Sequence, residues 1–269
     1  MNLLSVIDPS DSRIAFFKQL RGNDPRITSA NGVLVEGEKQ VERLLQLKLP
    51  LLTLFMEPKF YARFKPLLSL RDLSTTECFV ADREIMSEII GYPLHNGVMA
   101  LAERPKPVSL FDLKPPIVAF NSLADPENIG SIARSCVAFG VASLLVDSLS
   151  CDPLIRRAVR VSMGCLLTMD ICYVSSLSRA ITRLNETLES IAIENSPNAL
   201  PISAGALPLQ SVLVFGNERM GISGEVLSVC KRQIKIPMNA DLIESLNVSA
   251  TASIVLERLY STIQQSLVT

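Results

Sequence analysis

Arg134 is the one charged residue between Glu127 and Asp147, and its isolation makes it a candidate for chemistry. It lies in the first of three segments whose polar and small residues could form a binding loop, NSLADPENIGSIARSCVAFG over residues 121–140. Burying an unpaired guanidinium costs free energy, so Arg134 either extends to solvent or meets an anionic partner, and the helical pattern leaves both open. Asn128 has the residue type of a helix N-cap, and a cap is what we expect it to be.

A second segment, LVFGNERMGIS over residues 213–223, places glycines directly after an apolar run. Glycine lets a ligand approach the backbone closely, so a binding loop is expected after this strand. The segment nearly matches a phosphate-binding P-loop, but Ile222 stands where that motif needs lysine, which argues against nucleoside triphosphate hydrolysis. Glu218 is expected by default to be an exposed loop carboxylate that pairs with Arg219.

The third segment, IKIPMNADLIESLNVSATASIVLERL over residues 234–259, predicts a strand closed by Pro237, then a loop and a helix. Ser245 is the expected N-cap of that helix. The small residues that follow Asn247 allow another element to approach the helix backbone closely. General physical chemistry thus indicates three candidate loops and no particular reaction, although the lack of a Gly-x-Gly-x-x-Gly run argues against a nicotinamide-dependent oxidoreductase.

The amino-acid composition excludes several kinds of site and partner. The chain has a single histidine, His95, so a cluster of histidine ligands is excluded, no metal is expected, and His95 is expected to be a loop residue. The six cysteines include no Cys-x-x-Cys pair and are expected to be buried thiols of a protein in the reducing cytoplasm. Because 26 basic residues balance 27 acidic ones, neither a nucleic-acid tail nor a polybasic anchor is expected. The longest apolar run, residues 137–146, is too short to cross a bilayer, so no membrane partner is expected.

The elements that must position these residues form two domains. Proline-rich stretches at residues 104–107 and 114–116 indicate a linker over 108–116. Before it, apolar runs alternate with helical patterns, which predicts a small α/β domain over 1–107. After it, short apolar runs separated by helix-length segments predict a second α/β domain over 117–269 with a mainly parallel sheet.

The expected strands of the second domain are the apolar runs at residues 117–120, 142–146, 169–174, 191–193, 211–215 and 233–236. Open parallel sheets bind ligands beyond the carboxyl ends of their strands. We therefore expect the site in the loops that follow Phe120, Phe215 and Ile236, which are the loops of the three candidate segments.

At these residues the sequence resembles the SpoU/TrmH-type branch of the SPOUT superfamily, RNA ribose 2′-O-methyltransferases that use S-adenosylmethionine. The three motifs of that family occur in order, at residues 128–134, 215–221 and 236–249. The resemblance covers roughly residues 117–259 and is specific because the motifs occur jointly at the expected strand ends.

The resemblance implies a C-terminal α/β domain whose chain is threaded into a deep trefoil knot, one of the rare exceptions to the no-knot rule. Residues 34–37 and 97–100 look like parts of a ribosomal-protein-like domain that is often fused to these enzymes, so the N-terminal domain is expected to bind the RNA substrate. The loop at residues 238–244 is about one residue longer than the common form of the family.

The resemblance also implies site residues. The positions that match catalytic residues of the family are Arg134, Asn128, Glu218, Ser245 and Asn247. The positions that match its cofactor-binding residues are Phe215, Gly216, Ile236, Met238, Leu246 and Asn247. Because a guanidinium stays protonated at neutral pH, Arg134 is expected to stabilise the developing ribose oxyanion and to position a phosphate.

The leading hypothesis is therefore a cytoplasmic RNA ribose 2′-O-methyltransferase with S-adenosyl-L-methionine as its cofactor and structured RNA as its substrate, ribosomal RNA more than transfer RNA. The resemblance implies a homodimer, which would double a basic surface expected from Arg156, Arg157 and Arg160. The alternatives are a transfer RNA 2′-O-methyltransferase and, from a different class, a non-catalytic RNA-binding protein on the same fold.

Overall fold

The computed structural model describes residues 2–20, 25–47, 49–94, 97–239 and 245–268. Packing divides the chain into two compact units, Met1–Pro105 with Leu154–Leu167 and Lys106–Pro153 with Thr168–Thr269. Residues 154–167 therefore group with the N-terminal unit, although they follow the predicted linker in the sequence. The predicted domain limits of 1–107, 108–116 and 117–269 stay a prediction.

The first unit is built on a mixed five-stranded sheet of order β1-β4-β3-β5-β2. Its strands are β1 (Asn2–Ser5), β2 (Gly32–Glu36), β3 (Leu51–Met56), β4 (Glu77–Val80) and β5 (Val98–Glu103). The first three strands in this order are parallel, whereas β5 runs antiparallel to both β3 and β2. Strand β2 is buried at every position, as expected for a strand that is covered on both faces.

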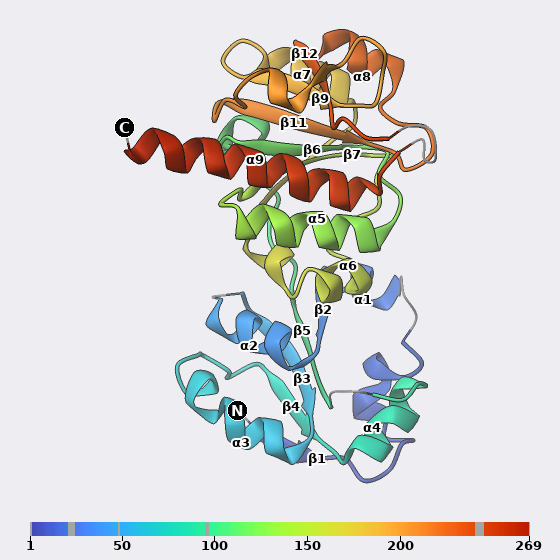
Figure 1. The fold of residues 1–269 in the computed structure, drawn as a ribbon. Coiled ribbons are helices and arrows are strands. Elements are labelled where there is room, and N and C mark those ends of the chain that lie inside the picture. Colours follow the sequence, from blue (N-terminus) through green and yellow to red (C-terminus); the bar gives the residue numbers. More distant parts are fainter. Residues whose placement is uncertain (1, 21–24, 48, 95–96, 240–244, 269) are drawn as a thin grey trace. The chain divides into compact units, whose positions relative to one another are not determined.

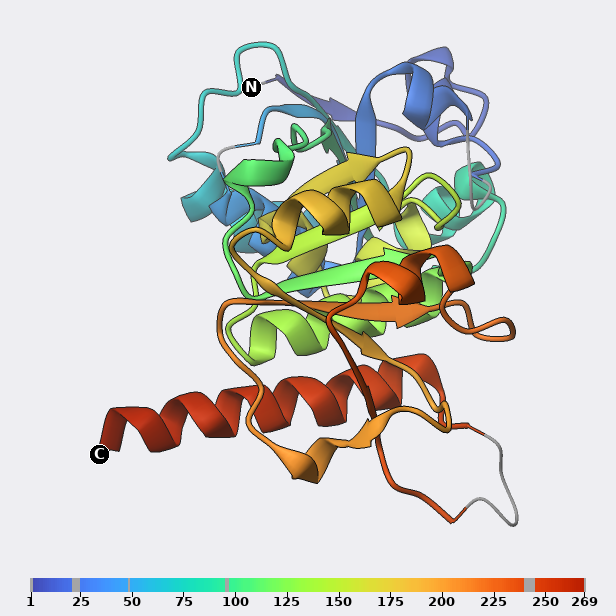
Figure 2. The same ribbon diagram turned by 90° about the horizontal axis from the view of Figure 1, so that it is seen from above.

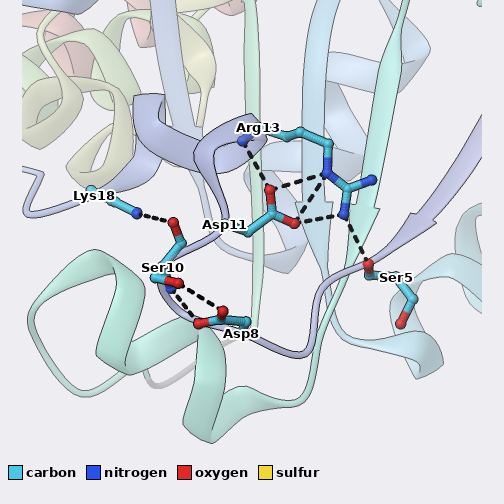
Figure 3. Close-up of polar contacts among 6 residues, drawn as sticks. All are labelled: Ser5, Asp8, Ser10, Asp11, Arg13 and Lys18. Carbon is cyan, nitrogen blue, oxygen red and sulfur yellow. Dashed lines mark hydrogen bonds and ion pairs between the residues drawn. The ribbon is translucent and has the colours of Figure 1, made fainter.

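Helices cover both faces of this sheet. They are η1 (Ser12–Phe17), α1 (Pro25–Ser29), α2 (Glu38–Gln46), α3 (Pro58–Leu68) and α4 (Arg83–Ile90). Side chains of η1 and α4, such as Phe17 and Met86, pack on one face of the sheet. Asp11 caps η1 by accepting the backbone N–H of Arg13 at 2.9 Å, and its ion pair with the Arg13 guanidinium helps to hold its pKa at about 2 (Figure 3).

Helix α6 (Arg156–Val161) packs on β2 in the first unit. Its Arg156 forms an ion pair with Glu36 at 2.8 Å, and the two side chains are only 12% and 11% exposed. The Arg156 guanidinium also lies over the Tyr92 ring, 4.7 Å from its centroid. The expectation that Arg156 contributes to a basic surface is therefore wrong, because its charge is already paired and covered.

The second unit is built on a seven-stranded sheet of order β10-β12-β9-β11-β6-β7-β8, in which every pairing is parallel. The strands are β6 (Ile117–Asn121), β7 (Ser143–Asp147), β8 (Asp170–Val174), β9 (Glu189–Ile193), β10 (Leu200–Pro201), β11 (Ser211–Gly216) and β12 (Arg232–Lys235). The prediction of a parallel sheet in this half of the chain is confirmed.

Two pairs of helices enclose this sheet, and in Figure 1 α7 and α8 lie above it whereas α5 and α9 lie below it. These helices are α5 (Pro126–Ala138), α7 (Leu177–Leu184), α8 (Gly224–Val229) and α9 (Val248–Val268). Short 3-10 turns lie elsewhere in the chain, namely η2 (Leu110–Asp112), η3 (Cys165–Thr168) and η4 (Ile202–Ala204). Alternate strand residues such as Ala119 and Val214 pack with Ile181 of α7. In Figure 2, α9 is the long red helix that runs toward the C-terminus.

The cysteines are free thiols, of which Cys78, Cys136, Cys165 and Cys172 are buried and Cys151 and Cys230 are partly exposed. In the described part of the chain, no helix has the length and apolarity that a bilayer crossing requires. His95 and residues 240–244, which include most of the lengthened third loop, lie outside the described residues.

Candidate functional site

A pocket of about 440 Å³ opens at the carboxyl ends of β9, β11 and β12 in the second unit. This is the edge at which an open parallel sheet binds its ligands. The predicted site residues that line it are Phe215, Gly216, Glu218, Ile236, Met238, Ser245, Leu246 and Asn247. The second and third candidate segments therefore meet in one cavity, although ten residues separate them in the sequence.

A series of hydrogen bonds between side chains connects this pocket to α5. Asn128 Nδ2 donates to Glu218 Oε1 at 2.9 Å, and Asn247 Nδ2 donates to Asn128 Oδ1 at 3.0 Å. Both ends of the Asn128 amide are thus in use, and the side chain is 7% exposed. The three candidate segments are joined at this amide.

The expectation that Asn128 caps α5 is wrong. The cap is Asp125, whose carboxylate accepts the backbone N–H of Glu127 at 2.8 Å, and Pro126 opens the helix. Proline suits the first helical position because its missing N–H would have no partner there. Asn128 is consequently free to link Glu218 with Asn247 from inside the first turn.

Glu218 does not pair with Arg219 as expected but turns toward the N-terminal turn of α5. Its carboxylate accepts the backbone N–H groups of Asp125 at 3.2 Å and Ala124 at 3.4 Å, besides the Asn128 amide. Partial burial by itself raises the pKa of Glu218, but these hydrogen bonds outweigh it and hold the pKa below its ordinary value. Glu218 is therefore a fixed negative charge at a helix N-terminus.

Asn247 caps α9, and Ser245 does not. The Asn247 side-chain oxygen accepts the backbone N–H of Ser249 at 2.8 Å, which leaves its amide nitrogen for Asn128. Ser245 is exposed and lines the pocket instead. Further along α9, the small Ser253 makes a 2.8 Å hydrogen bond with Ser135 of α5, which confirms that small residues let another element approach closely.

Gly216 is required by the backbone of its own loop. Asn217 and Gly221 exchange two backbone hydrogen bonds of 3.0 Å, which fold the loop back onto the end of β11. A Cβ on Gly216 would lie 2.3 Å from the carbonyl carbon of Gly221 and 2.4 Å from the nitrogen of Ile222. Gly221 itself has φ +68°, a conformation that favours glycine.

A second carboxylate, which the sequence reasoning missed, holds the loop after β6. Asp147 at the end of β7 is 6% exposed and accepts from Asn121 Nδ2 at 3.0 Å and from the backbone N–H of Ser122. Asn121 in turn accepts the N–H of Ser223 at 2.7 Å, and Asn217 donates to the carbonyl of Ser122 at 2.7 Å. The sequence pattern could have identified Asp147, because this residue directly follows an apolar run at a predicted strand end.

Arg134 extends to solvent from α5 and does not line the pocket. Among the described residues its guanidinium has no hydrogen bond and no ion pair. An anionic partner within the described chain is therefore excluded, and the solvent-facing alternative of the sequence analysis applies to this single chain.

Glu194 and Asn195 also line the pocket and were not predicted. They follow β9, a strand whose loop carries none of the motifs. Their contribution depends on strand order, since β9 lies between β11 and β12 in the sheet and its carboxyl end therefore opens into the same cavity. Sequence periodicity identifies a strand but does not identify its neighbours.

Comparison with known proteins gives a consistent result. The chain matches the SpoU rRNA Methylase family over residues 115–257. An uncharacterized tRNA/rRNA methyltransferase of Mycobacterium tuberculosis (strain ATCC 25618 / H37Rv) is 29% identical over 266 residues, which cover 94% of this chain and 90% of that protein. The 23S rRNA (guanosine-2′-O-)-methyltransferase RlmB of Acinetobacter baylyi is 28% identical over 233 residues, or 82% of this chain and 93% of that protein.

Solved structures share the fold. The SpoU methyltransferase AviRb from Streptomyces viridochromogenes, in complex with the cofactor AdoMet, superposes with a TM-score of 0.81 at 22% identity and covers 95% of this chain and 100% of that one. An AdoMet-bound rRNA methyltransferase from Sinorhizobium meliloti superposes with a TM-score of 0.82 at 19% identity and covers 97% of this chain and 98% of that one.

Proposed function

Because this chain belongs to the SpoU rRNA Methylase family and is an RNA ribose 2′-O-methyltransferase that uses S-adenosylmethionine, we propose that its substrate is ribosomal RNA. The observation that carries the proposal is the similarity to a 23S ribosomal RNA 2′-O-methyltransferase across 82% of this chain, a span that reaches beyond the methylase match. Family membership also favours an enzyme over the non-catalytic RNA-binding alternative. Transfer RNA remains the competing substrate, since the mycobacterial relative is named for both RNAs.

The residues around the pocket fit S-adenosylmethionine. The pocket volume of about 440 Å³ is in the range of small-molecule sites. The lining of the pocket combines apolar side chains such as Ile236 and Leu246 with polar ones such as Ser245 and Asn247. When bound, S-adenosylmethionine supplies an electrophilic methyl group. We assign its binding to Phe215, Gly216, Ile236, Met238, Leu246 and Asn247.

Asn128, Glu218 and Asn247 act in this proposal as one preorganised unit at the pocket rim. The hydrogen bonds that join them fix the loop after β6, the loop after β11 and the start of α9 with respect to one another. A ribose that reached this rim would meet polar groups that need no rearrangement. Ser245, exposed in the same cavity, supplies a further hydroxyl for orienting the ribose.

Arg134 acts by charge. Its solvent-facing guanidinium, without a partner among the described residues, is available to an RNA phosphate and to the oxyanion that develops on the ribose. A guanidinium has five N–H donors and no acceptor, so this side chain stabilises negative charge and does not remove the hydroxyl proton.

The protein acts as a homodimer, with a second copy seated on α5 and α9. These helices pack side by side and expose apolar side chains, Val137 at 38%, Ile254 at 42% and Tyr260 at 38%. Because Arg134 is exposed three residues before Val137 on α5, it would lie at this interface, and the family resemblance implies that dimerisation brings an arginine of one copy near the site of the other. Arg157 and Arg160 of α6 are exposed and supply part of the RNA-binding charge of each copy.

The remaining parts of the proposal follow from the family resemblance. The N-terminal domain, residues 1–107, binds the RNA substrate, and the C-terminal domain carries a deep trefoil knot around the pocket. The protein works in the cytoplasm, where its thiols stay reduced.

The proposal is tested by incubating the purified protein with methyl-labelled S-adenosylmethionine and, separately, ribosomal RNA and transfer RNA lacking ribose methylation. Label recovered as a 2′-O-methylnucleoside from ribosomal RNA alone is the expected result. Label in transfer RNA alone would replace the proposed substrate by the competing one, and label on a base would contradict ribose methylation.

A further inference from the structure

Glu194 places in the pocket a carboxylate to which neither the motifs nor the proposed chemistry gives a role. It directly follows β9 and is half-buried. Its Oε2 accepts the backbone N–H of Ile222 at 2.8 Å. Within the described part of the chain, its Oε1 has no hydrogen bond and no basic group lies within ion-pair distance. A half-buried carboxylate with one donor favours a ligand that brings positive charge.

The other charged groups that line the pocket are Glu218, Lys235 and the exposed Arg219. Glu218 accepts three hydrogen bonds from the start of α5, and the Lys235 Nζ donates to the carbonyl of Ser196 at 3.2 Å. Glu194 is thus the lining carboxylate whose charge is most available to a ligand.

The position of Glu194 is fixed by the loop after β11. A Cβ on Gly221 would lie 2.8 Å from Glu194 Oε2 and 3.0 Å from Oε1, so the loop backbone is pressed against the carboxylate. Together with the hydrogen bond from Ile222, this contact keeps the charge in place before a ligand arrives. A fixed charge acts on a ligand without a cost of reorganisation.

We propose that Glu194 makes the pocket prefer the positively charged methyl donor to the product left after transfer. This inference rests on the proposed function. The reaction converts a sulfonium and a ribose hydroxyl into a thioether, a methyl ether and a released proton, so the cofactor loses one positive charge. A fixed carboxylate in the same cavity attracts S-adenosylmethionine by that charge and does not hold S-adenosylhomocysteine in the same way.

The test is calorimetric titration of the full chain with S-adenosylmethionine and with S-adenosylhomocysteine, before and after Glu194→Gln. Glutamine keeps the shape of the side chain and an oxygen that can accept the Ile222 N–H, but it removes the charge. We expect affinity for S-adenosylmethionine to fall roughly tenfold and affinity for S-adenosylhomocysteine to change by less than about twofold.

Two further variants separate charge from shape. Glu189→Gln removes a carboxylate at the opposite end of β9, where it pairs with Arg232 at 3.0 Å, and should leave the ratio of the two affinities unchanged. Lys235→Met removes a positive charge from the pocket itself and should move the ratio in the direction opposite to Glu194→Gln.

An equal loss of both affinities in Glu194→Gln would show that Glu194 only holds the loop, and this would overturn the inference. The inference would also be overturned if the ratio of the affinities for S-adenosylmethionine and S-adenosylhomocysteine stayed unchanged in both Glu194→Gln and Lys235→Met. In either case the proposed function would stand, because the unmodified chain would still bind the cofactor. An unmodified chain that bound neither ligand would overturn the proposed function and this inference together.

Discussion

Arg134 and Asn128 belong to the same helix, but Arg134 is exposed and its guanidinium has no hydrogen bond or ion pair with the described residues, whereas Asn128 is buried with both ends of its amide bonded. This contrast separates a group available to a substrate from a group that organises the site. Substitutions of the two should therefore differ in kind, with loss of charge stabilisation in the first case and loss of loop order in the second.

Arg134→Ala should lower methyl transfer at least about a hundredfold, because it removes the cation proposed to face the developing oxyanion. Affinity for S-adenosylmethionine should stay within about twofold, since Arg134 does not line the pocket. Transfer is measured by incorporation of labelled methyl groups and binding by calorimetry. Arg179→Ala, at an exposed arginine of α7, is the matched control and should keep full activity. Retained transfer in Arg134→Ala would remove this residue from the reaction.

Glu218 makes stability depend on pH in a predictable direction. Its pKa in the folded chain is below the ordinary value of 4.5, so its contribution is present above that value and is lost as the pH falls through the folded pKa. Between about pH 5 and pH 3, the thermal unfolding midpoint of the unmodified chain should therefore fall more steeply than that of Glu218→Gln. Circular dichroism measures both midpoints. Glu186→Gln, at an exposed carboxylate after α7, is the control, and equal slopes in all three proteins would contradict the assignment.

At the level of elements, the loop of residues 217–221 is shaped by steric contact with the end of β11. Gly216→Ala would place a methyl group 2.3 Å from the backbone of Gly221 and force the loop away from the strand. Cofactor affinity should fall at least roughly tenfold, as measured by calorimetry. Gly224→Ala is the matched control, because a Cβ at this first residue of α8 would meet no atom of the described residues within 4 Å and should leave affinity unchanged. Normal affinity in Gly216→Ala would show that the loop does not shape the pocket.

At the level of the whole molecule, the proposed dimer depends on apolar side chains of α5 and α9. Ile254→Glu places a charge where the second copy would lie, so this variant should elute as a single chain of 29.4 kDa while the unmodified protein elutes at twice that mass. Light scattering after gel filtration measures the mass. Leu209→Glu is the control, since Leu209 is equally exposed at 43% but lies outside both helices. An unmodified protein that runs as a monomer would refute the dimer.

Local pattern was sufficient for much of this protein. The apolar runs at residues 117–120 and 211–215 fall within β6 and β11, and their alternation with helical segments predicted a parallel sheet. The motif resemblance selected residues that do line one pocket, Gly216 and Leu246 among them. Such features are readable because hydrophobic periodicity and turn residues act over a few neighbours along the chain.

Tertiary packing decided the rest. The position of β9 between β11 and β12 brings Glu194 into the pocket, and the approach of α9 to α5 makes Asn128 a link between loops where the local pattern indicated a cap. Likewise, Arg156 is paired with Glu36, 120 residues away in the chain. The type of a residue limits which hydrogen bonds and ion pairs its side chain can make. The partner in those bonds is determined by long-range packing, and no single segment of the sequence encodes that packing.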